Sequence, residues 1–465
     1  MTDLRELYQE TIIDHGRHPR NFKSMDDATI LKEGFNPLIP KYDDMSGVSE
    51  YFIPNPSRFR FVEFPIYNIF VYPLYLIFGI DDKYHRLVSV LFSCGSTLFL
   101  YLIVRKYSYK FVAFLASLTF AVLPFGVFFS RTTLPEPTLV FFALGMMYFV
   151  SEWLEKDRVK NLILAFLFTT IAFLIKPWAF FFYLPIFYLV LKEKKVLKFL
   201  IFSLLAISPF LLWRLWIQQQ PEGIPASSWL MNGDGIRFRP SFWWWIVSER
   251  MGREILGTTG LVLFFLGFIL KPKNGNYFLH FWVLSIFLYF CIFATGNVRH
   301  DYYQYIFVPV ASTFVALGLY ALVKTENLFI PRIFTIITAI FLYVLMLYFG
   351  YKQVIGFYQI NNFAMVEAGK KADEILPKNA IVLAPYNGDS AFLYQTRRSG
   401  WAFVPTSIED LIADYGVNYY VSTSYDDKTN WVLRHFYAIE QTPNFIIADL
   451  TRLKKAFDNQ NDREP

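Results

Sequence analysis

The chain has 465 residues, of which 55% are hydrophobic, 20% aromatic and only 18% charged, and its net charge is +6. With a mean hydropathy of +0.33, this composition excludes an ordinary soluble domain and a chain that binds nucleic acid through its charge. Apolar runs recur from residue 87 to residue 350, and each is long enough, or nearly so, to cross a hydrocarbon core of roughly 30 Å. We therefore predict a polytopic α-helical membrane protein.

The first 38 residues differ from the rest. The stretch "LRELYQETIIDHGRHPRNF", continuing through "DDATILKEGFNPL", resembles the N-terminus of NifU/IscU-type iron–sulfur scaffold proteins. Those scaffolds hold their cluster with three cysteines, the first of which is expected soon after "NPL", and "NPLIPKYDD" contains none. We expect residues 1–38 to be a foreign, chimeric start that replaces a first membrane helix. The alternative is a native amphipathic helix in the cytosol, and an iron–sulfur assembly scaffold is a remote alternative function that rests on this segment alone.

Residues 39–86 are predicted to form a first extracytoplasmic loop. Within it, "IYNIFVYPLYLIFGI" at residues 66–80 is rich in Tyr and Phe, and counting it as a span would break the alternation of the loops. We interpret it as an interfacial helix that lies on the outer leaflet.

About ten spans follow in a transmembrane domain at residues 87–350. One helix over residues 160–191 would be far longer than the bilayer is thick, so a hairpin that turns at Lys176-Pro177 is predicted there. The predicted spans are 87–104, 111–128, 134–150, 160–175, 177–191, 196–213, 256–270, 278–296, 305–323 and 330–350.

The distribution of Lys and Arg predicts the orientation. One set of short connections holds fourteen of these residues, and the opposite set holds eight, five of them in a single long loop. Positive residues favour the cytoplasmic side. The loop at residues 214–255 and everything beyond residue 350 are therefore expected outside the cytoplasmic membrane.

The sequence after residue 350 becomes polar. "MVEAGKKADEILPKNAIVLAPY" predicts a helix and then a strand, and "SIEDLIADYGVNYYVSTS" repeats this pattern with Gly416 placed to end the helix. "NFIIADL" predicts another strand. Residues 351–465 are thus expected to form a small extracytoplasmic α/β domain.

Several ionisable residues gather at outward ends of the predicted spans. They are Glu63, Arg131, Glu136, Lys176, Arg214 and the triplet Arg299, His300 and Asp301. Charges at such depths are costly unless they face a polar cavity or pair with one another. A shared outward cavity is the economical explanation; the alternative is that each side chain reaches the interface independently.

The order of several segments resembles the GT-C superfamily, in particular the family 39-like and aminoarabinose-transferase-like membrane glycosyltransferases, including dolichyl-phosphate-mannose-protein mannosyltransferases. These segments are "FVEFPIYNIF", "RLVSVLFSCGSTLFLYLIVRK", "PFGVFFSRTTLPEPTLVFF" and "HDYYQYIFVPVAS". The resemblance implies transfer of a sugar from a polyprenyl-phosphate carrier to a glycan, lipid or protein acceptor outside the membrane.

The resemblance also implies which acids act in catalysis. Asp44 and Asp43, in "KYDDMSG", match the acid of the family's first loop, with Asp44 slightly favoured; the alternative is a solvated turn. Glu63 matches the second acidic position and is expected to orient the acceptor or bind a divalent cation. Its alternative is a carboxylate at the start of a helix.

The leaving phosphate requires cationic donors, and we expect Arg131, Lys176, Arg299 and His300 to supply them. His300 is also a possible metal ligand. Predicted acceptor or sugar contacts are Glu136, Asp301, Tyr302 and Trp244. Glu136 could instead pair with Arg131, and Trp244 could instead anchor the membrane interface.

No cofactor is certain from the sequence, although a divalent cation is possible. The expected partners are the lipid-linked donor, membrane lipids and the acceptor. A transporter or flippase of lipid-linked glycans is the alternative function, because it would also need a polar cavity. It should show two repeated halves, and no such repeat is visible in the sequence.

Overall fold

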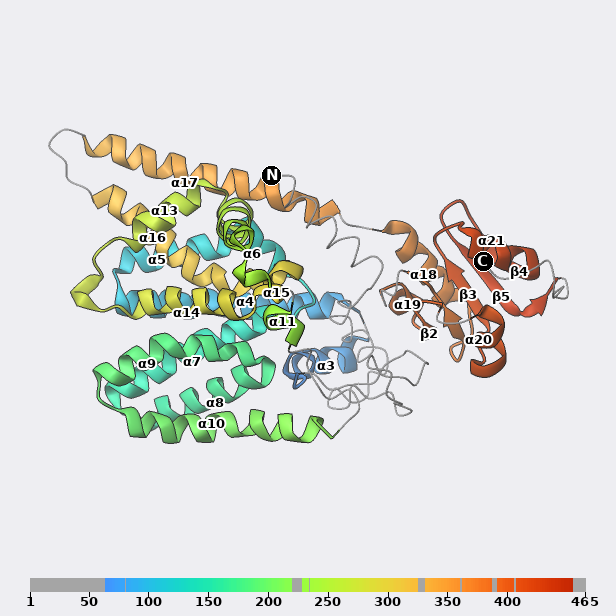
Figure 1. Cartoon of the computed structure of the whole chain (residues 1–465), viewed down its shortest axis with the longest axis horizontal. Helices are drawn as coiled ribbons and strands as arrows, with labels where there is room; N and C mark the ends of the chain where they lie inside the picture. The colour runs from blue at the N-terminus through green and yellow to red at the C-terminus, as the bar shows by residue number, and fades with distance from the viewer. Residues whose placement is uncertain are drawn as a thin grey trace. The chain divides into compact units, whose positions relative to one another are not determined.

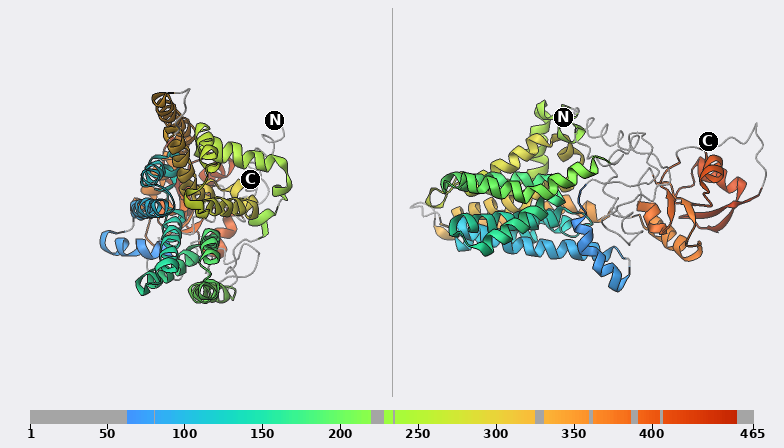
Figure 2. Two further views of the ribbon diagram at one scale, coloured as in Figure 1. Left: turned by 90° about the vertical axis from the view of Figure 1, so that its left-hand side faces the viewer. Right: turned by 90° about the horizontal axis from the view of Figure 1, so that it is seen from below.

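The computed structural model describes residues 63–79, 81–219, 228–233, 235–324, 331–359, 362–386, 391–404 and 407–454. Residues 1–38 and the two acids of the first loop, Asp43 and Asp44, lie outside this described part. The chain forms two compact units. The larger is helical and comprises Glu63–Trp216 and Pro225–Ile360, and the smaller includes the C-terminal residues. Figures 1 and 2 show the helices of the larger unit running alongside one another.

The helical unit contains both long helices and short helical segments. In chain order they are α3 (Ile66–Phe78), α4 (Lys83–Tyr107), α5 (Lys110–Val122), α6 (Pro124–Phe129), α7 (Glu136–Lys156), α8 (Val159–Ile175), η2 (Pro177–Phe182), α9 (Tyr183–Lys192), α10 (Val196–Ile217), α11 (Ser228–Asn232), η3 (Ile236–Phe238), α12 (Pro240–Trp244), η4 (Trp245–Ile255), α13 (Thr259–Phe268), η5 (Lys273–Gly275), α14 (Phe278–Ile292), α15 (Ala294–Arg299), η6 (Asp301–Phe307), α16 (Val308–Lys324), α17 (Arg332–Val354) and η7 (Ile355–Gln359).

Each predicted span overlaps a helix, so the helical membrane fold is confirmed. Among the described residues, five helices are long and apolar enough to cross a membrane. They are α4, α7, α10, the helix formed by η6 and α16, and the helix that begins at Arg332. Several other apolar helices, including α5, α8 and α14, have only 10–17 residues. The fold is therefore that of a multi-pass membrane protein, and the total of ten spans stays a prediction.

Helix α3 forms where the interfacial helix was predicted. Tyr67 and Val71 on one face are buried, whereas Leu76 and Ile77 are 68% and 70% exposed. The Tyr75 hydroxyl bonds the His85 Nδ1 atom of α4 at 2.9 Å. The buried face of α3 therefore packs on α4, whereas the apolar C-terminal end of α3 stays exposed.

The Lys-rich connections meet at one end of the helical unit. Lys106 Nζ lies 2.8 Å from Glu152 and 3.0 Å from Glu155, while Lys198 pairs with Asp157. Lys273 Nζ donates to the Ser108 carbonyl at 2.9 Å. The helix ends that these residues occupy, on α4, α7, α10 and the α13–α14 connection, thus lie together, as the charge pattern predicted.

A sharp bend separates η4 from α13. The helices Pro240–Ile255 and Thr259–Phe268 meet at 112°, and η4 is a π-helix. Gly257 lies at the bend with φ of 50°, and a Cβ atom there would lie 2.1 Å from the Met346 carbonyl. Only glycine fits such a close approach. The bend gives α12 and η4 a direction separate from that of the neighbouring spans.

The C-terminal unit is built on a five-stranded sheet in the order β2-β1-β3-β5-β4. Strands β1 (Ile381–Leu383), β2 (Ser399–Trp401) and β3 (Tyr419–Ser422) pair in parallel, and β5 (Ile446–Leu453) pairs antiparallel with β3 and β4 (Phe436–Gln441). Figure 1 shows helices flanking this sheet. They are α18 (Phe363–Ile375), α19 (Ala391–Thr396), α20 (Ile408–Tyr415) and α21 (Asp427–His435).

The predicted elements of this unit are confirmed. Helix α20 begins after Ser407, whose side chain accepts from the Asp410 amide, and it ends at Gly416 with φ of 68°. In the same unit, the Arg398 guanidinium is completely buried. It donates to Asp373 Oδ1 at 2.6 Å and to the Leu376 and Pro377 carbonyls at 2.7 Å. Arg398 therefore ties β2 to the end of α18.

Candidate active site

A buried ion pair joins Lys176 and Glu136 at the end of the helical unit opposite the Lys-rich connections. Lys176 Nζ donates to Glu136 Oε1 at 2.5 Å, and the two residues are only 6% and 1% exposed. Pro177 excludes the helical conformation at Lys176, which ends α8 with an extended backbone at φ of −156°. Glu136 is the first residue of α7, where free backbone amides favour a negative charge.

Aromatic rings surround the Lys176 ammonium. Its Nζ atom lies 5.4 Å from the ring centroid of Tyr303 and 5.8 Å from those of Tyr302 and Trp178. Rings at this range attract a cation and keep water away from it. The lysine therefore holds a positive charge in an apolar setting, where its interaction with an anion is stronger than in water.

Glu63 belongs to the same group of residues. The amide of its neighbour, Phe64, donates to the Leu174 carbonyl at 3.2 Å, just before Lys176 in the chain. Glu63 is half-buried and interacts electrostatically with Lys176, Glu136 and Arg214. The sequence segments around residues 63, 136 and 176 are far apart along the chain but converge at one place.

Two buried polar atoms in this region have no hydrogen-bond partner among the described residues. They are Glu136 Oε2 and the Trp178 indole nitrogen Nε1. A carboxylate oxygen accepts hydrogen bonds and an indole nitrogen donates them, and leaving either unsatisfied in a buried place is costly. One acceptor and one donor are thus left for a bound molecule or for water.

Asp301 anchors the neighbouring turn through a second charge cluster. Arg250 on η4 pairs with Asp301 and with Glu254, and its guanidinium lies 4.6 Å from the Trp245 ring. The Gln304 amide donates to the His300 carbonyl at 3.2 Å and to the Asn297 carbonyl at 2.6 Å. These contacts fix the segment that carries Tyr302 and Tyr303 beside Lys176.

Comparisons with known proteins bear on the family and the fold. Residues 65–213 match the family described as dolichyl-phosphate-mannose-protein mannosyltransferase. The structure of ArnT from Cupriavidus metallidurans in the apo state superposes with a TM-score of 0.60 at 12% identity, over 91% of this chain and 92% of that one. The GT-C resemblance is confirmed. The same ArnT bound to undecaprenyl phosphate also gives a TM-score of 0.60 at 12% identity, over 97% and 98% of the two chains.

Two further relatives extend the comparison. An Archaeoglobus fulgidus oligosaccharyltransferase tethered to an acceptor peptide has a TM-score of 0.51 at 11% identity, over 90% of this chain and 68% of its own. An uncharacterized protein from Aquifex aeolicus (strain VF5) is 42% identical over 76 residues, which are 16% of this chain and 18% of that relative. At 11–12% identity the structures show a shared fold.

The structure brings together four of the residues predicted from the sequence: Glu63, Glu136, Lys176 and Tyr302. His300 lies beside them, since its ring is 5.1 Å from that of Tyr302. Glu136 pairs with Lys176, not with Arg131, which was the partner considered from the sequence.

Three other predicted residues occupy further positions in the described part of the chain. The Arg131 guanidinium lies 4.4 Å from the Tyr358 ring. Trp244 ends α12 and is 53% exposed. Arg299 is the last residue of α15. Their predicted contacts with donor and acceptor stay predictions.

Sequence reasoning missed Trp178, Tyr303 and the Arg250–Glu254 pair. Trp178 directly follows the Lys176-Pro177 turn, and Arg250 and Glu254 have the spacing of an ion pair on a helix, so both signals were present. Their relation to Lys176 and Asp301 depends on tertiary contacts that no local pattern reveals.

A divalent cation at Glu63 and His300 also stays a prediction. Within the described residues, no group of three or more His, Cys, Asp and Glu side chains is arranged to hold a metal ion. Glu63 and His300 would supply one oxygen ligand and one nitrogen ligand, and a bound cation generally requires more.

Proposed function

We propose that this protein is a membrane glycosyltransferase, which moves a sugar from a polyprenyl-phosphate-linked donor to a glycan, lipid or protein acceptor outside the cytoplasmic membrane. The observation that carries the proposal is the buried Lys176–Glu136 pair with Glu63 beside it. The family match at residues 65–213 and the ArnT fold, known with undecaprenyl phosphate bound, support it. The proposed topology has ten spans, with this site at the extracytoplasmic end.

The proposed reaction is an inverting displacement. The acceptor oxygen forms a bond to the anomeric carbon while the bond from that carbon to the phosphate oxygen breaks. A carboxylate takes the acceptor proton; Asp44, Asp43 and Glu63 are the candidates. Polyprenyl phosphate leaves with the bonding electron pair.

Lys176 stabilises the negative charge that develops on the leaving phosphate, because its ammonium is held in a low-dielectric surrounding before the donor arrives. Glu136 is a positioning residue. It holds the lysine at the end of α8, and its second oxygen can accept a hydrogen bond from a hydroxyl group of the sugar. The Trp178 nitrogen can donate to a phosphate or sugar oxygen.

The test is sugar transfer in membranes that contain the full chain. Membranes receive a panel of radiolabelled polyprenyl-phosphate sugars, and release of polyprenyl phosphate is measured together with labelled acceptor. We expect Lys176→Met to lower turnover by roughly 100-fold or more, as does the loss of one preorganised donor in other enzymes. We expect Glu63→Gln to lower it as well.

Lys160→Met is the matched control, since Lys160 is exposed at the Lys-rich end. Activity in Lys176→Met equal to that of the control would refute the role of this site. If the protein were a flippase, a different result would be expected: in vesicles, it would move a lipid-linked glycan across the bilayer without releasing the polyprenyl phosphate. The charged residues of the proposed site, Glu63, Glu136 and Lys176, lie together at one end of the helical unit, which favours the transferase.

A further inference from the structure

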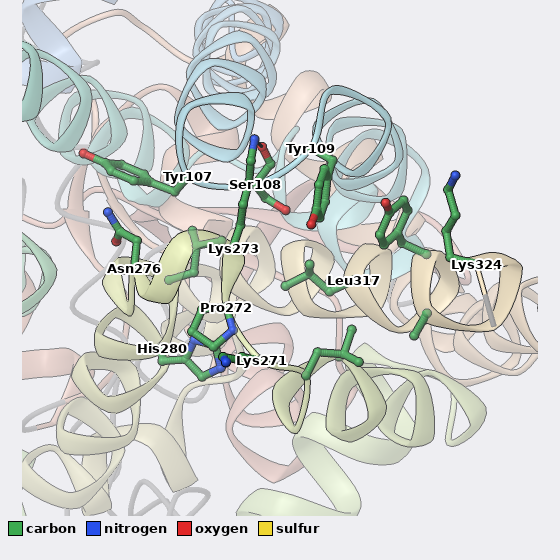
Figure 3. Close-up of a pocket in the computed structure, with 15 residues that line it drawn as sticks. Tyr107, Ser108, Tyr109, Lys271, Pro272, Lys273, Asn276, His280, Leu317 and Lys324 are labelled. Carbon is green, nitrogen blue, oxygen red and sulfur yellow. Dashed lines mark hydrogen bonds between the residues drawn. The ribbon is translucent and has the colours of Figure 1, made fainter. Parts of the chain in front are cut away.

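A pocket lies at the Lys-rich end of the helical unit, where α4, α13 and α16 end and where α5 and α14 begin. It is a cavity of about 290 Å³, near the lower size limit of small-molecule sites. Figure 3 shows its lining, which includes Lys271, Lys273 and Lys324. Lys271 and Lys273 come from the α13–α14 connection and Lys324 from the end of α16, and the fold brings them around one cavity.

The charge of the pocket is one-sided. None of the fifteen residues that line it in the described part of the chain is acidic. The Lys273 ammonium is fixed, because it donates to the Ser108 carbonyl at 2.9 Å and lies 4.9 Å from the Tyr109 ring. Lys271 and Lys324 are exposed. Such a pocket attracts an anion.

The polar lining adds hydrogen-bonding groups. His280 Nε2 bonds the Phe268 carbonyl at 3.0 Å, while its buried Nδ1 has no partner among the described residues. Since Nε2 must carry the proton to donate to a carbonyl, Nδ1 of the neutral ring is an acceptor. Tyr109 and Tyr320 stack with their centroids 4.8 Å apart and form part of the wall. The polar groups that face the cavity are thus accompanied by aromatic rings, and a ligand with an anionic group fits this lining.

Apolar side chains continue from the pocket toward the outside. Leu270 and Leu317 line the cavity, and next to them Ile269 is 75% exposed and Phe268 is 37% exposed. An apolar exposed surface at the end of a membrane helix is where lipid acyl chains lie. A basic pocket with an apolar exit is therefore suited to a headgroup whose tails stay in the bilayer.

We propose that this pocket binds a phosphate group, carried by the headgroup of an anionic phospholipid or by a soluble phosphate. The apolar exit favours the lipid as the source. By the distribution of positive residues, the pocket opens at the cytoplasmic leaflet, so it is separate from the Lys176 site. The proposal does not depend on the proposed glycosyl transfer.

The test uses the purified full chain in nanodiscs of dioleoylphosphatidylcholine, with a minor fraction of dioleoylphosphatidylglycerol. Native mass spectrometry measures how much phosphatidylglycerol stays bound. The variant is Lys271→Gln with Lys324→Gln, because Lys273 also caps α4 and its loss would disturb the fold. The control is Arg158→Gln with Lys160→Gln, which removes the same charge; Arg158 lies just before α8, Lys160 lies in its first turn, and both are exposed.

We expect the pocket variant to bind phosphatidylglycerol roughly 30-fold more weakly, because each lysine near a membrane surface contributes about 1 kcal/mol, and we expect the control to stay near the wild type. Equal losses in the two variants would overturn the proposal, because general surface charge would then explain the binding. No retention of phosphatidylglycerol by the wild type, together with no effect of inorganic phosphate, would also overturn it.

A second arm separates the two sources. The thermal midpoint of the wild type and of both variants is measured in pure phosphatidylcholine, with and without inorganic phosphate. Stabilisation by inorganic phosphate that the pocket variant alone loses identifies soluble phosphate as a ligand. Retention of phosphatidylglycerol without that stabilisation identifies the lipid headgroup. The midpoints without phosphate also show whether each variant is folded.

Discussion

Lys176 and Glu136 hold opposite charges in a place that excludes water almost completely. Removing two ions from water costs several kcal/mol each, and their attraction offsets this cost only when the geometry is good. The pair contributes little to stability in net terms for that reason. Its significance is that the charge of Lys176 stays in a fixed place at the junction of α7 and α8.

The first prediction concerns this pair. Glu136→Ala leaves the lysine charge buried without a partner, so we expect it to lower the free energy of unfolding by about 3–5 kcal/mol. Glu136→Gln combined with Lys176→Met removes both charges and should regain most of that stability while transfer stays absent. Thermal unfolding in detergent measures the change in stability, and the transfer assay measures the loss of sugar transfer. A double variant as unstable as Glu136→Ala would contradict this explanation.

At the scale of elements, the close crossing of α13 and α16 depends on two glycines. A Cβ atom at Gly318 would lie 2.1 Å from the Leu263 carbonyl, and one at Gly267 would lie 2.0 Å from the Phe314 carbonyl. Because the obstacles are backbone atoms, no side chain can move aside to relieve them. Small residues allow membrane helices to approach in this way.

We predict that Gly318→Ala forces the two helices apart and costs about 1–3 kcal/mol, the usual range for overpacking. Gly356→Ala is the control, since a Cβ atom there meets nothing within 4 Å. Thermal unfolding of both variants in the same detergent checks this. Equal midpoints would mean that α13 and α16 are less closely packed than described.

The C-terminal unit gives a prediction about pH. Partial burial alone would raise the pKa of the Asp373 carboxyl, but hydrogen bonds from Lys378 and Arg398 bring that pKa below its usual value of 3.8. The contribution of Asp373 to stability is therefore complete above about pH 4 and is lost as the pH falls through the lowered pKa. Hydrogen exchange of α18 in the full chain, measured between about pH 5 and pH 3, should show this loss.

Asp373→Asn should remove that pH dependence and lower stability at neutral pH by about 1.5–3 kcal/mol, the usual contribution of hydrogen bonds to a charged group. Lys378→Gln is the comparison, because Lys378 is exposed whereas Arg398 is buried, and it should cost much less. A pH dependence that persists in Asp373→Asn would assign the effect to another acid.

Those parts of the fold that depend on a local sequence pattern could be predicted from the sequence. Apolar length predicted the helices, Pro177 predicted the turn at Lys176, and Gly416 predicted the end of α20. The π-helix η4 and its 112° bend could not be predicted, because they depend on packing against α17 at Gly257. The partner of Glu136 was missed for a similar reason: Arg131 is five residues away in the chain, whereas Lys176 is forty residues away and approaches only in the folded protein.

At the scale of the whole helical unit, two groups of charged residues occupy opposite ends. The Lys-rich connections meet at one end, and Glu63, Glu136, Lys176 and Asp301 lie at the other. This separation is the basis of the proposed orientation, and it can be tested without knowing the sugar or the acceptor.

We predict that single cysteines at positions 63, 131 and 300 react with a membrane-impermeant maleimide in intact cells, while cysteines at 160 and 192 react only after permeabilisation. The background carries Cys94→Ala and Cys291→Ala, because Cys94 is exposed and Cys291 is partly exposed. The two lysine positions serve as the controls for sidedness. Reaction of positions 63 and 300 from different sides would rule out a shared site.

The pairing of Lys176 with Glu136 also bears on turnover in the proposed reaction. The donor is a phosphodiester with one negative charge, whereas the released carrier is a monoester that loses a second proton near pH 6. An uncompensated buried lysine would hold this more highly charged product tighter than the donor, and product inhibition would follow. With Glu136 bonded to the same ammonium, part of that attraction is already cancelled, so the spent carrier can dissociate and the next donor can enter.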